Sequence, residues 1–271
     1  MNQGDTAMDR SDTAMSQSDT AIGQARRTSI MRRVLLGAVV TGAVVFGAVV
    51  AGSAVFGSPG VAAATAATRA VPAHSKPAAT VPPKPHIIQQ LIAFGAKRRA
   101  QTVKYNRIHY GQATWRLKPK VIVLHYTAGG TEASTHALFN ANQPNMGVLP
   151  GVVAHFIIDK NGKIYQQLAL NIRGRHTVGL NQVSIGIEFV QKAGRSSAWA
   201  ANQIIRRKPQ IKAGLKLVRW LQWRYHIKVQ NVTGHGIANK SPYFKDRLHW
   251  RNTHVDWLGP AVSRFRVMLR F

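Results

Sequence analysis

The chain has 271 residues, 45% of them hydrophobic, and it contains no cysteine. This length allows one or two domains with a core of useful size. The missing cysteines exclude disulfides and cysteine-bound metals, so any metal must be held by His, Asp or Glu. The formal net charge is +28, from 37 Lys+Arg against 9 Asp+Glu. Such a charge favours anionic partners, namely nucleic acid, anionic lipid or phosphate-bearing wall polymers, and it does not specify a fold.

Acidic residues are scarce after residue 57, where 32 Lys+Arg stand against 5 Asp+Glu. In such a basic chain a carboxylate is a candidate for a specific task. The five acids of this region are Glu132, Asp159, Glu188, Asp246 and Asp256.

Residues 1–33 are polar and small, with a repeat of period seven that begins at Asp5, Asp12 and Asp19. Because they offer no apolar stripe, we expect a disordered cytoplasmic tail. Met31 stands just before two arginines and an apolar run, so translation from Met31 instead of Met1 is an open alternative.

Residues 34–57 form an uncharged run of 24 residues, long enough to span a bilayer as a helix. Four arginines lie within the eight residues before it, and the next basic residue after it is Arg69. This asymmetry predicts a cytoplasmic N-terminus and an exported remainder. We favour an uncleaved membrane anchor. A signal cleaved near Ala62, which would give a secreted protein, is the alternative.

The rest of the chain divides into three parts. Residues 58–85 are rich in Ala, Pro and Thr and predict an extended, disordered linker. Residues 86–118 form a basic extension with weak periodicity. Residues 119–271 have the pattern of a globular domain.

Apolar periodicity assigns the elements of this domain. The continuous run Val121–Leu124 indicates a strand buried on both faces. Asn161-Gly162 suits a tight hairpin turn between two strands. Further strands are expected at 152–159, 163–167, 183–190 and 232–233, and helices at 131–140, from 209 onward and at 260–269. Strands mixed with helices predict a single α/β domain with a central mixed β-sheet flanked by helices.

Three residues of the domain are candidates for chemistry. His125 directly follows the run Val121–Leu124, and His235 follows the short strand at 232–233. Glu188 lies in a strand whose alternation places Ser184, Gly186 and Glu188 on one face. Taken singly, each has an ordinary explanation, as a surface histidine or as the partner of an arginine.

In combination, these residues belong to a series of motifs in a fixed order. The series closely resembles the zinc-dependent N-acetylmuramoyl-L-alanine amidases of the type-2 family, which are related in fold to peptidoglycan-recognition proteins. The resemblance covers about residues 119–271. It is carried by His125-Tyr-Thr-Ala-Gly-Gly, Ala154-His155-Phe-Ile-Ile-Asp, Asn161-Gly162-Lys-Ile-Tyr-Gln, His176, Asn181 through Glu188, and Thr233-Gly234-His235.

The resemblance implies a Zn²⁺ ion held by His125, His235 and a third ligand. Asp256 best matches the closing motif of the aspartate branch of the family, and Asp246 is the alternative. Zinc with three protein ligands keeps one position for water or substrate. The matching residues then imply Glu188 as general base and His254 as the group that stabilises the oxyanion.

Two positions depart from relatives. His254 stands where they often carry Lys, so its charge would depend on pH. Ala154 stands where some of them carry a catalytic tyrosine, which leaves the proton transfer to Glu188.

The implied activity is hydrolysis of the amide between N-acetylmuramic acid and L-alanine in peptidoglycan. A peptidoglycan-binding module without turnover is the alternative, although such modules usually lack a metal ligand. The charge alone would also suit a nucleic-acid binder, but the chain has no clustered basic helix and no recognised motif of that kind. We therefore expect a monomer that binds peptidoglycan and anionic wall polymers and contacts the membrane through residues 34–57.

Overall fold

The structure is a computed structural model that describes residues 81–270. The predicted tail at 1–33, the apolar segment 34–57 and the linker up to residue 80 lie outside the described residues. Within residues 81–270, no helix has both the length and the apolar character needed to cross a membrane.

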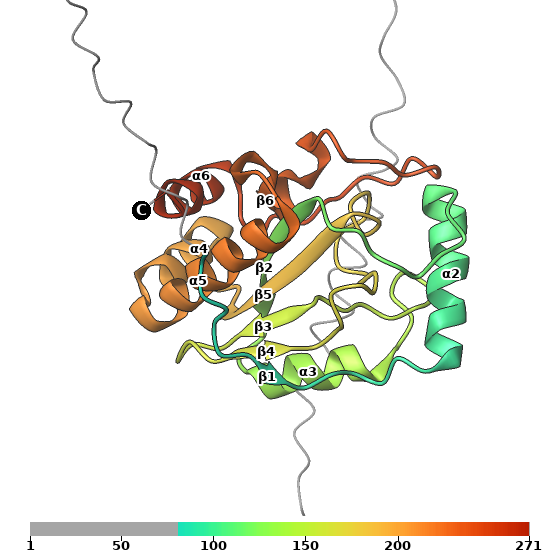
Figure 1. The fold of residues 1–271 in the computed structure, drawn as a ribbon, viewed down its shortest axis with the longest axis horizontal. Coiled ribbons are helices and arrows are strands. Elements are labelled where there is room, and N and C mark those ends of the chain that lie inside the picture. The colour runs from blue at the N-terminus through green and yellow to red at the C-terminus, as the bar shows by residue number, and fades with distance from the viewer. Residues whose placement is uncertain (1–80, 271) are drawn as a thin grey trace, which may run out of the picture. The chain divides into compact units, whose positions relative to one another are not determined.

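The described part is an α/β domain built on one six-stranded sheet (Figure 1). The strand order is β1-β4-β3-β5-β2-β6. All neighbours are parallel except β3 and β4, so the sheet is mixed as predicted. The elements are β1 (Ile88–Gln89), α2 (Ala96–Tyr110), β2 (Val121–Ala128), α3 (Glu132–Ala141), β3 (Phe156–Ile158), β4 (Ile164–Gln166), β5 (Ser184–Lys192), α4 (Ser197–Arg206), α5 (Lys208–Tyr225), β6 (Val232–Gly234) and α6 (Gly259–Met268), with short 3-10 helices at Val229–Asn231 and His235–Lys240.

The centre of the sheet is formed by β2 and β5. Val121 through Leu124 are fully buried, as the continuous apolar run predicted. Alternation sends Ile122 and Leu124 to the face covered by α4, α5 and α6, where the main core lies. Phe265 of α6 and the indole of Trp257 close this core, with ring centroids 5.6 Å apart.

The opposite face of β2 and β5 is more polar. Val121 and Val123 pack there with Leu180 in a small cluster. The paired positions His125 and Glu188 follow on the same face at the carboxyl end of the two strands. The sheet thus has one face for the core and one face that carries ionisable groups.

The hairpin predicted at Asn161-Gly162 joins β3 to β4. Gly162 has a φ of +87°, which a residue with a side chain rarely adopts. A Cβ at this position would also lie 2.7 Å from the carbonyl oxygen of Pro209, at the start of α5. The glycine therefore lets the turn approach the helix closely.

Residues 86–118, which the sequence assigned to an extension, contribute two elements to the domain. β1 pairs with β4, and α2 buries a polar face. The guanidinium of Arg98 on that face donates to the carbonyl oxygen of Phe139 at 2.8 Å. Its buried neighbours are Thr102, Tyr105, Asn106, His109 and Tyr110. Because this face is held by hydrogen bonds and stacked rings, apolar periodicity could not indicate it.

We predict that Phe265→Ala lowers the free energy of unfolding by about 3–5 kcal/mol, because it removes a fully buried ring and leaves a cavity. Val267→Ala on the same helix is the control, since that side chain is 51% exposed and its loss should cost about 0.5 kcal/mol or less. Urea unfolding of both variants measures the difference. Equal destabilisation would show that the face assignment of α6 is wrong.

Candidate metal centre

Two parallel strand ends bring the predicted histidines together. In the register of β2 and β6, Leu124 lies opposite Gly234. His125 follows Leu124 and His235 follows Gly234, so their side chains meet at the carboxyl edge of the sheet. The sites of open α/β sheets usually lie at this edge. Both residues are buried.

Glycines on either side of His235 let the closing segment dock against it. A Cβ on Gly234 would lie 1.9 Å from the carbonyl oxygen of Trp257. The amide of Gly236 donates to the carbonyl oxygen of Asp256 at 2.7 Å. Trp257 is fully buried, and its indole N–H donates to the carbonyl oxygen of His125 at 3.1 Å. Burial of Trp257 therefore fixes the position of Asp256 beside the histidines.

The three predicted ligands lie within bonding reach of one ion. Nδ1 of His125 is 3.1 Å from Nδ1 of His235. The Asp256 carboxylate lies 3.3 Å from the first nitrogen and 3.1 Å from the second. Zinc bonds of about 2.0–2.1 Å in a tetrahedron separate neighbouring ligand atoms by about 3.3 Å. His125, His235 and Asp256 thus fit a tetrahedral zinc ion by donor type and spacing.

The charge states of His125 and Asp256 also suit a metal. Burial, and then electrostatic repulsion from neighbouring His235, lowers the pKa of His125 to about 4. Burial alone would raise the pKa of Asp256, but hydrogen bonds and charges from both histidines hold that pKa well below its ordinary value. A neutral imidazole and an ionised carboxylate are the forms that bind metal.

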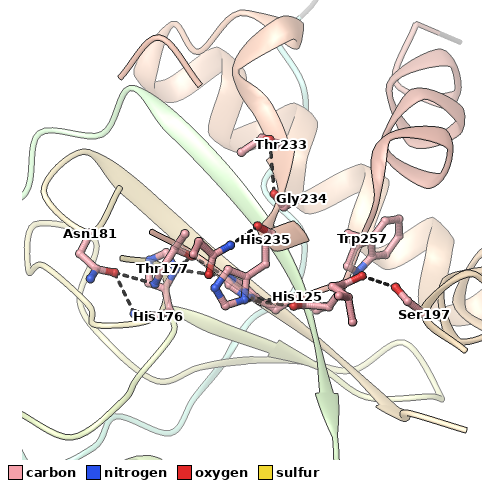
Figure 2. A network of polar contacts seen from close by, with 12 residues as sticks. His125, His176, Thr177, Asn181, Ser197, Thr233, Gly234, His235 and Trp257 are labelled. Atoms are coloured by element: carbon pink, nitrogen blue, oxygen red, sulfur yellow. Dashed lines mark hydrogen bonds and ion pairs between the residues drawn. The ribbon is translucent and has the colours of Figure 1, made fainter. Parts of the chain in front are cut away.

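A hydrogen-bond network orients the other nitrogen of His125 (Figure 2). Nε2 of His125 lies 3.1 Å from Nδ1 of His176 and 3.2 Å from the hydroxyl of Thr177. The side-chain oxygen of Asn181 accepts from the amides of both residues. Such contacts fix the tautomer and the ring direction of a ligand. The sequence indicated His176 only as a member of the motif series, without a role, and did not indicate Thr177. No local pattern reveals which residue faces His125.

Gly186 provides the space for His176. A Cβ at this position would lie 2.7 Å from Cγ of the His176 ring. Ser184, two residues earlier on the same face of β5, has its hydroxyl 3.4 Å from Nε2 of His176. The face predicted from the alternation of β5 is therefore confirmed.

Glu188 lies beside the triad without a partner of its own. It is in register with His125 on β2 and Ile157 on β3. Its Oε2 atom is buried and has no hydrogen-bond partner among the described residues. Burial, and then the charge of Asp256, raises the pKa of Glu188 well above its ordinary value. A free acceptor in this position is available to a water or a substrate, and a nearby cation would favour its ionised form.

His254 lies over His235, the second predicted ligand. Its ring stacks on His235 with centroids 4.2 Å apart and an interplanar angle of 16°. Partial burial, together with His235, lowers the pKa of His254. The same segment is held by Asn252, whose amide donates to the carbonyl oxygen of His235 at 2.5 Å.

Asp246, the alternative third ligand, does not join the triad. Its carboxylate lies 2.8 Å from Nδ1 of His109 on α2. The other carboxylate oxygen accepts the amides of Leu248 and Trp250 at 2.9 and 3.3 Å. Asp246 thus ties the loop before Asp256 to α2, and the structure brings only Asp256 to the two histidines.

Comparison with known proteins gives a family match. Residues 115–248 match the family Amidase_2, described as N-acetylmuramoyl-L-alanine amidase. The match includes His125, Glu188 and His235 but ends before His254 and Asp256. Over 137 residues the chain is 32% identical to N-acetylmuramoyl-L-alanine amidase AmiD of Escherichia coli, which covers 47% of this chain and 48% of that protein. The chain therefore spans about half the length of this curated relative.

Solved structures give similar matches. A mutant endolysin from Bacillus subtilis is 26% identical, with a TM-score of 0.36, over 55% of this chain and 83% of that one. The Ph2119 endolysin from a Thermus scotoductus bacteriophage is 22% identical, with a TM-score of 0.41, over 67% and 99%. The family match thus makes residues 115–248 of this chain similar to the N-acetylmuramoyl-L-alanine amidases.

Proposed function

We propose that the chain hydrolyses the amide between N-acetylmuramic acid and L-alanine in peptidoglycan, with zinc as its cofactor. The observation that carries the proposal is the meeting of His125, His235 and Asp256 within 4.8 Å of one another, beside the unpartnered carboxylate of Glu188. The similarity of residues 115–248 to the N-acetylmuramoyl-L-alanine amidases indicates which bond is cut.

The three ligands would hold the ion and leave one position free. When bound, zinc supplies Lewis acidity, which polarises the amide carbonyl and makes water a stronger acid. His176 and Thr177 keep the His125 ring in its ligating orientation through Nε2. Asp256 is held in place by the burial of Trp257.

Glu188 acts as the general base and then as the general acid. Its buried oxygen accepts a proton as the water oxygen bonds to the carbonyl carbon. It then delivers that proton to the amide nitrogen, so that the carbon–nitrogen bond breaks. The stem peptide leaves with a free amine on its L-alanine, and the muramic acid keeps a carboxyl group. The raised pKa of Glu188 suits the second of these two steps.

His254 assists at the carbonyl oxygen. Its exposed ring stacks on His235 and carries an N–H donor. A donor in this place stabilises the charge that develops on the oxygen as the tetrahedral intermediate forms. Because Ala154 has no acid–base group, Glu188 is the proton carrier in this proposal.

We further propose that the domain works outside the cytoplasm, anchored by residues 34–57 or secreted after cleavage. The uncharged run and the arginines before it support this location. Peptidoglycan, the proposed substrate, also lies on that side of the membrane.

Glu188→Gln should lower turnover by about 10²–10⁴-fold, the usual contribution of a general acid–base group. The amide is close in size to the carboxylate, so metal content and fold should be retained. Release of stem peptide from purified peptidoglycan measures turnover, and metal analysis of the same sample measures occupancy.

Glu132→Gln makes the same replacement at the amino end of α3 and is the matched control. It should keep turnover within about threefold of the parent chain. If Glu188→Gln were as active as this control, the proposed base would be wrong. If neither the parent chain nor the control released stem peptide, the chain would be a binding module.

The metal ligands can be tested by two matched aspartate variants. Asp256→Asn should reduce zinc content at least tenfold, because it removes the anionic ligand, and His125→Ala should do the same. Asp246→Asn should retain zinc, since an amide can still accept the loop hydrogen bonds of Asp246. Elemental analysis after dialysis checks this prediction. The reverse outcome for the two aspartates would make Asp246 the ligand.

A further inference from the structure

A groove on the outer face of α2 lies apart from the metal centre. It has a volume of about 610 Å³ and runs between the helix and the indole of Trp115. α2 stands at the edge of the domain in Figure 1, upright beside the sheet. The groove is lined by Ala96, Arg99, Ala100, Val103, Lys104, Arg107 and Trp115. The helix precedes the family match, which begins at residue 115.

The cations of this groove have no anionic partner in the domain. Arg99, Lys104 and Arg107 are all exposed. No Asp or Glu occurs between Asp19 and Glu132 in the sequence. In residues 81–270, the ion pairs involve only histidines with Asp246 or Asp256. The groove therefore presents a positive charge that an anion from outside can neutralise.

Trp115 holds two guanidinium groups in place. Those of Arg99 and Arg116 lie 4.9 and 4.6 Å from the centre of its ring. Phe94 packs near the same indole, with ring centroids 6.2 Å apart. Stacking on the ring faces restricts the guanidinium planes but leaves their N–H edges free, and these edges match the oxygens of a phosphate.

The spacing of the charges favours a polymer over a single ion. Arg99 and Arg107 are eight residues apart on α2, about 12 Å along the axis at 1.5 Å per residue. This separation favours a different phosphate for each of the two arginines. A chain of phosphates can supply both by following the groove. The small side chains of Ala96 and Ala100 keep its floor open.

We propose that this groove binds a flexible wall polymer of polyol units linked by phosphodiesters. A single-stranded nucleic acid is less suited, because it needs free aromatic faces on which bases stack. Trp115 already has two arginines over its ring. Binding here would hold the chain on its insoluble matrix without occupying the metal centre, and it does not depend on turnover.

The test is the affinity of the full chain for purified poly(glycerol phosphate), measured by titration calorimetry at several salt concentrations. Arg99→Gln with Arg107→Gln should weaken binding at low salt at least tenfold. It should also lower the slope of log Kd against log salt by roughly 1.4, at about 0.7 per lost phosphate contact. Trp115→Leu, which removes the platform for Arg99 and Arg116, should weaken binding as well.

The matched control is Arg206→Gln with Arg270→Gln, which removes two exposed arginines elsewhere on the domain. It should keep the affinity within about twofold. Equal weakening in both double variants would mean that net charge, and not the groove, binds the polymer. Tighter binding of a single-stranded oligonucleotide with the same number of phosphates would also overturn the proposal. Circular dichroism of each variant confirms that a loss of binding is not a loss of fold.

Discussion

The geometry of the domain depends on the close docking of one short segment against the end of β6. Gly234 leaves no room for a Cβ where the carbonyl oxygen of Trp257 approaches. Trp257 itself is fully buried and donates to the carbonyl oxygen of His125. The apolar gain of burying this indole thus holds the neighbouring Asp256 carboxylate between two imidazoles. A buried carboxylate is costly unless it is paired or binds a metal. A metal ion held here would compensate the charge of Asp256.

Scarcity of acids shapes the rest of the molecule. Buried arginines usually pair with carboxylates, but here their guanidinium NH₂ groups donate to neutral acceptors. Arg98 donates to the carbonyl oxygen of Phe139, and Arg175 to those of Val148 and Pro150. Arg173 donates to the side chains of Asn106 and Gln112. Three of the five carboxylates after residue 57 are thereby left for the candidate metal centre, as Glu188 and Asp256, and for the His109–Asp246 pair. The surface keeps its positive charge.

α2 connects the two regions of interest. Its inner face holds the loop before Asp256, through the contact between His109 and Asp246. Its outer face carries the basic groove beside Trp115. The helix lies before residue 115, where the match to the amidase family begins.

The sequence by itself determined the elements whose side chains follow a simple period. The apolar run Val121–Leu124, the alternation around Glu188 and the turn at Gly162 predicted the central strands and the hairpin. The motif order then indicated both histidines. It could not predict α2, because that helix is held by buried polar groups and has no apolar stripe.

Tertiary structure alone decided between Asp246 and Asp256, which both follow His235 at plausible distances along the chain. The position of a loop residue depends on the distant residues that the loop packs against. The sequence around that residue does not reveal those contacts. Burial of Trp257 brings Asp256 to the histidines, and His109, more than a hundred residues earlier, takes Asp246 away from them. The roles of His176 and Thr177 were likewise set by contacts across the sheet, which spacing along one strand does not contain.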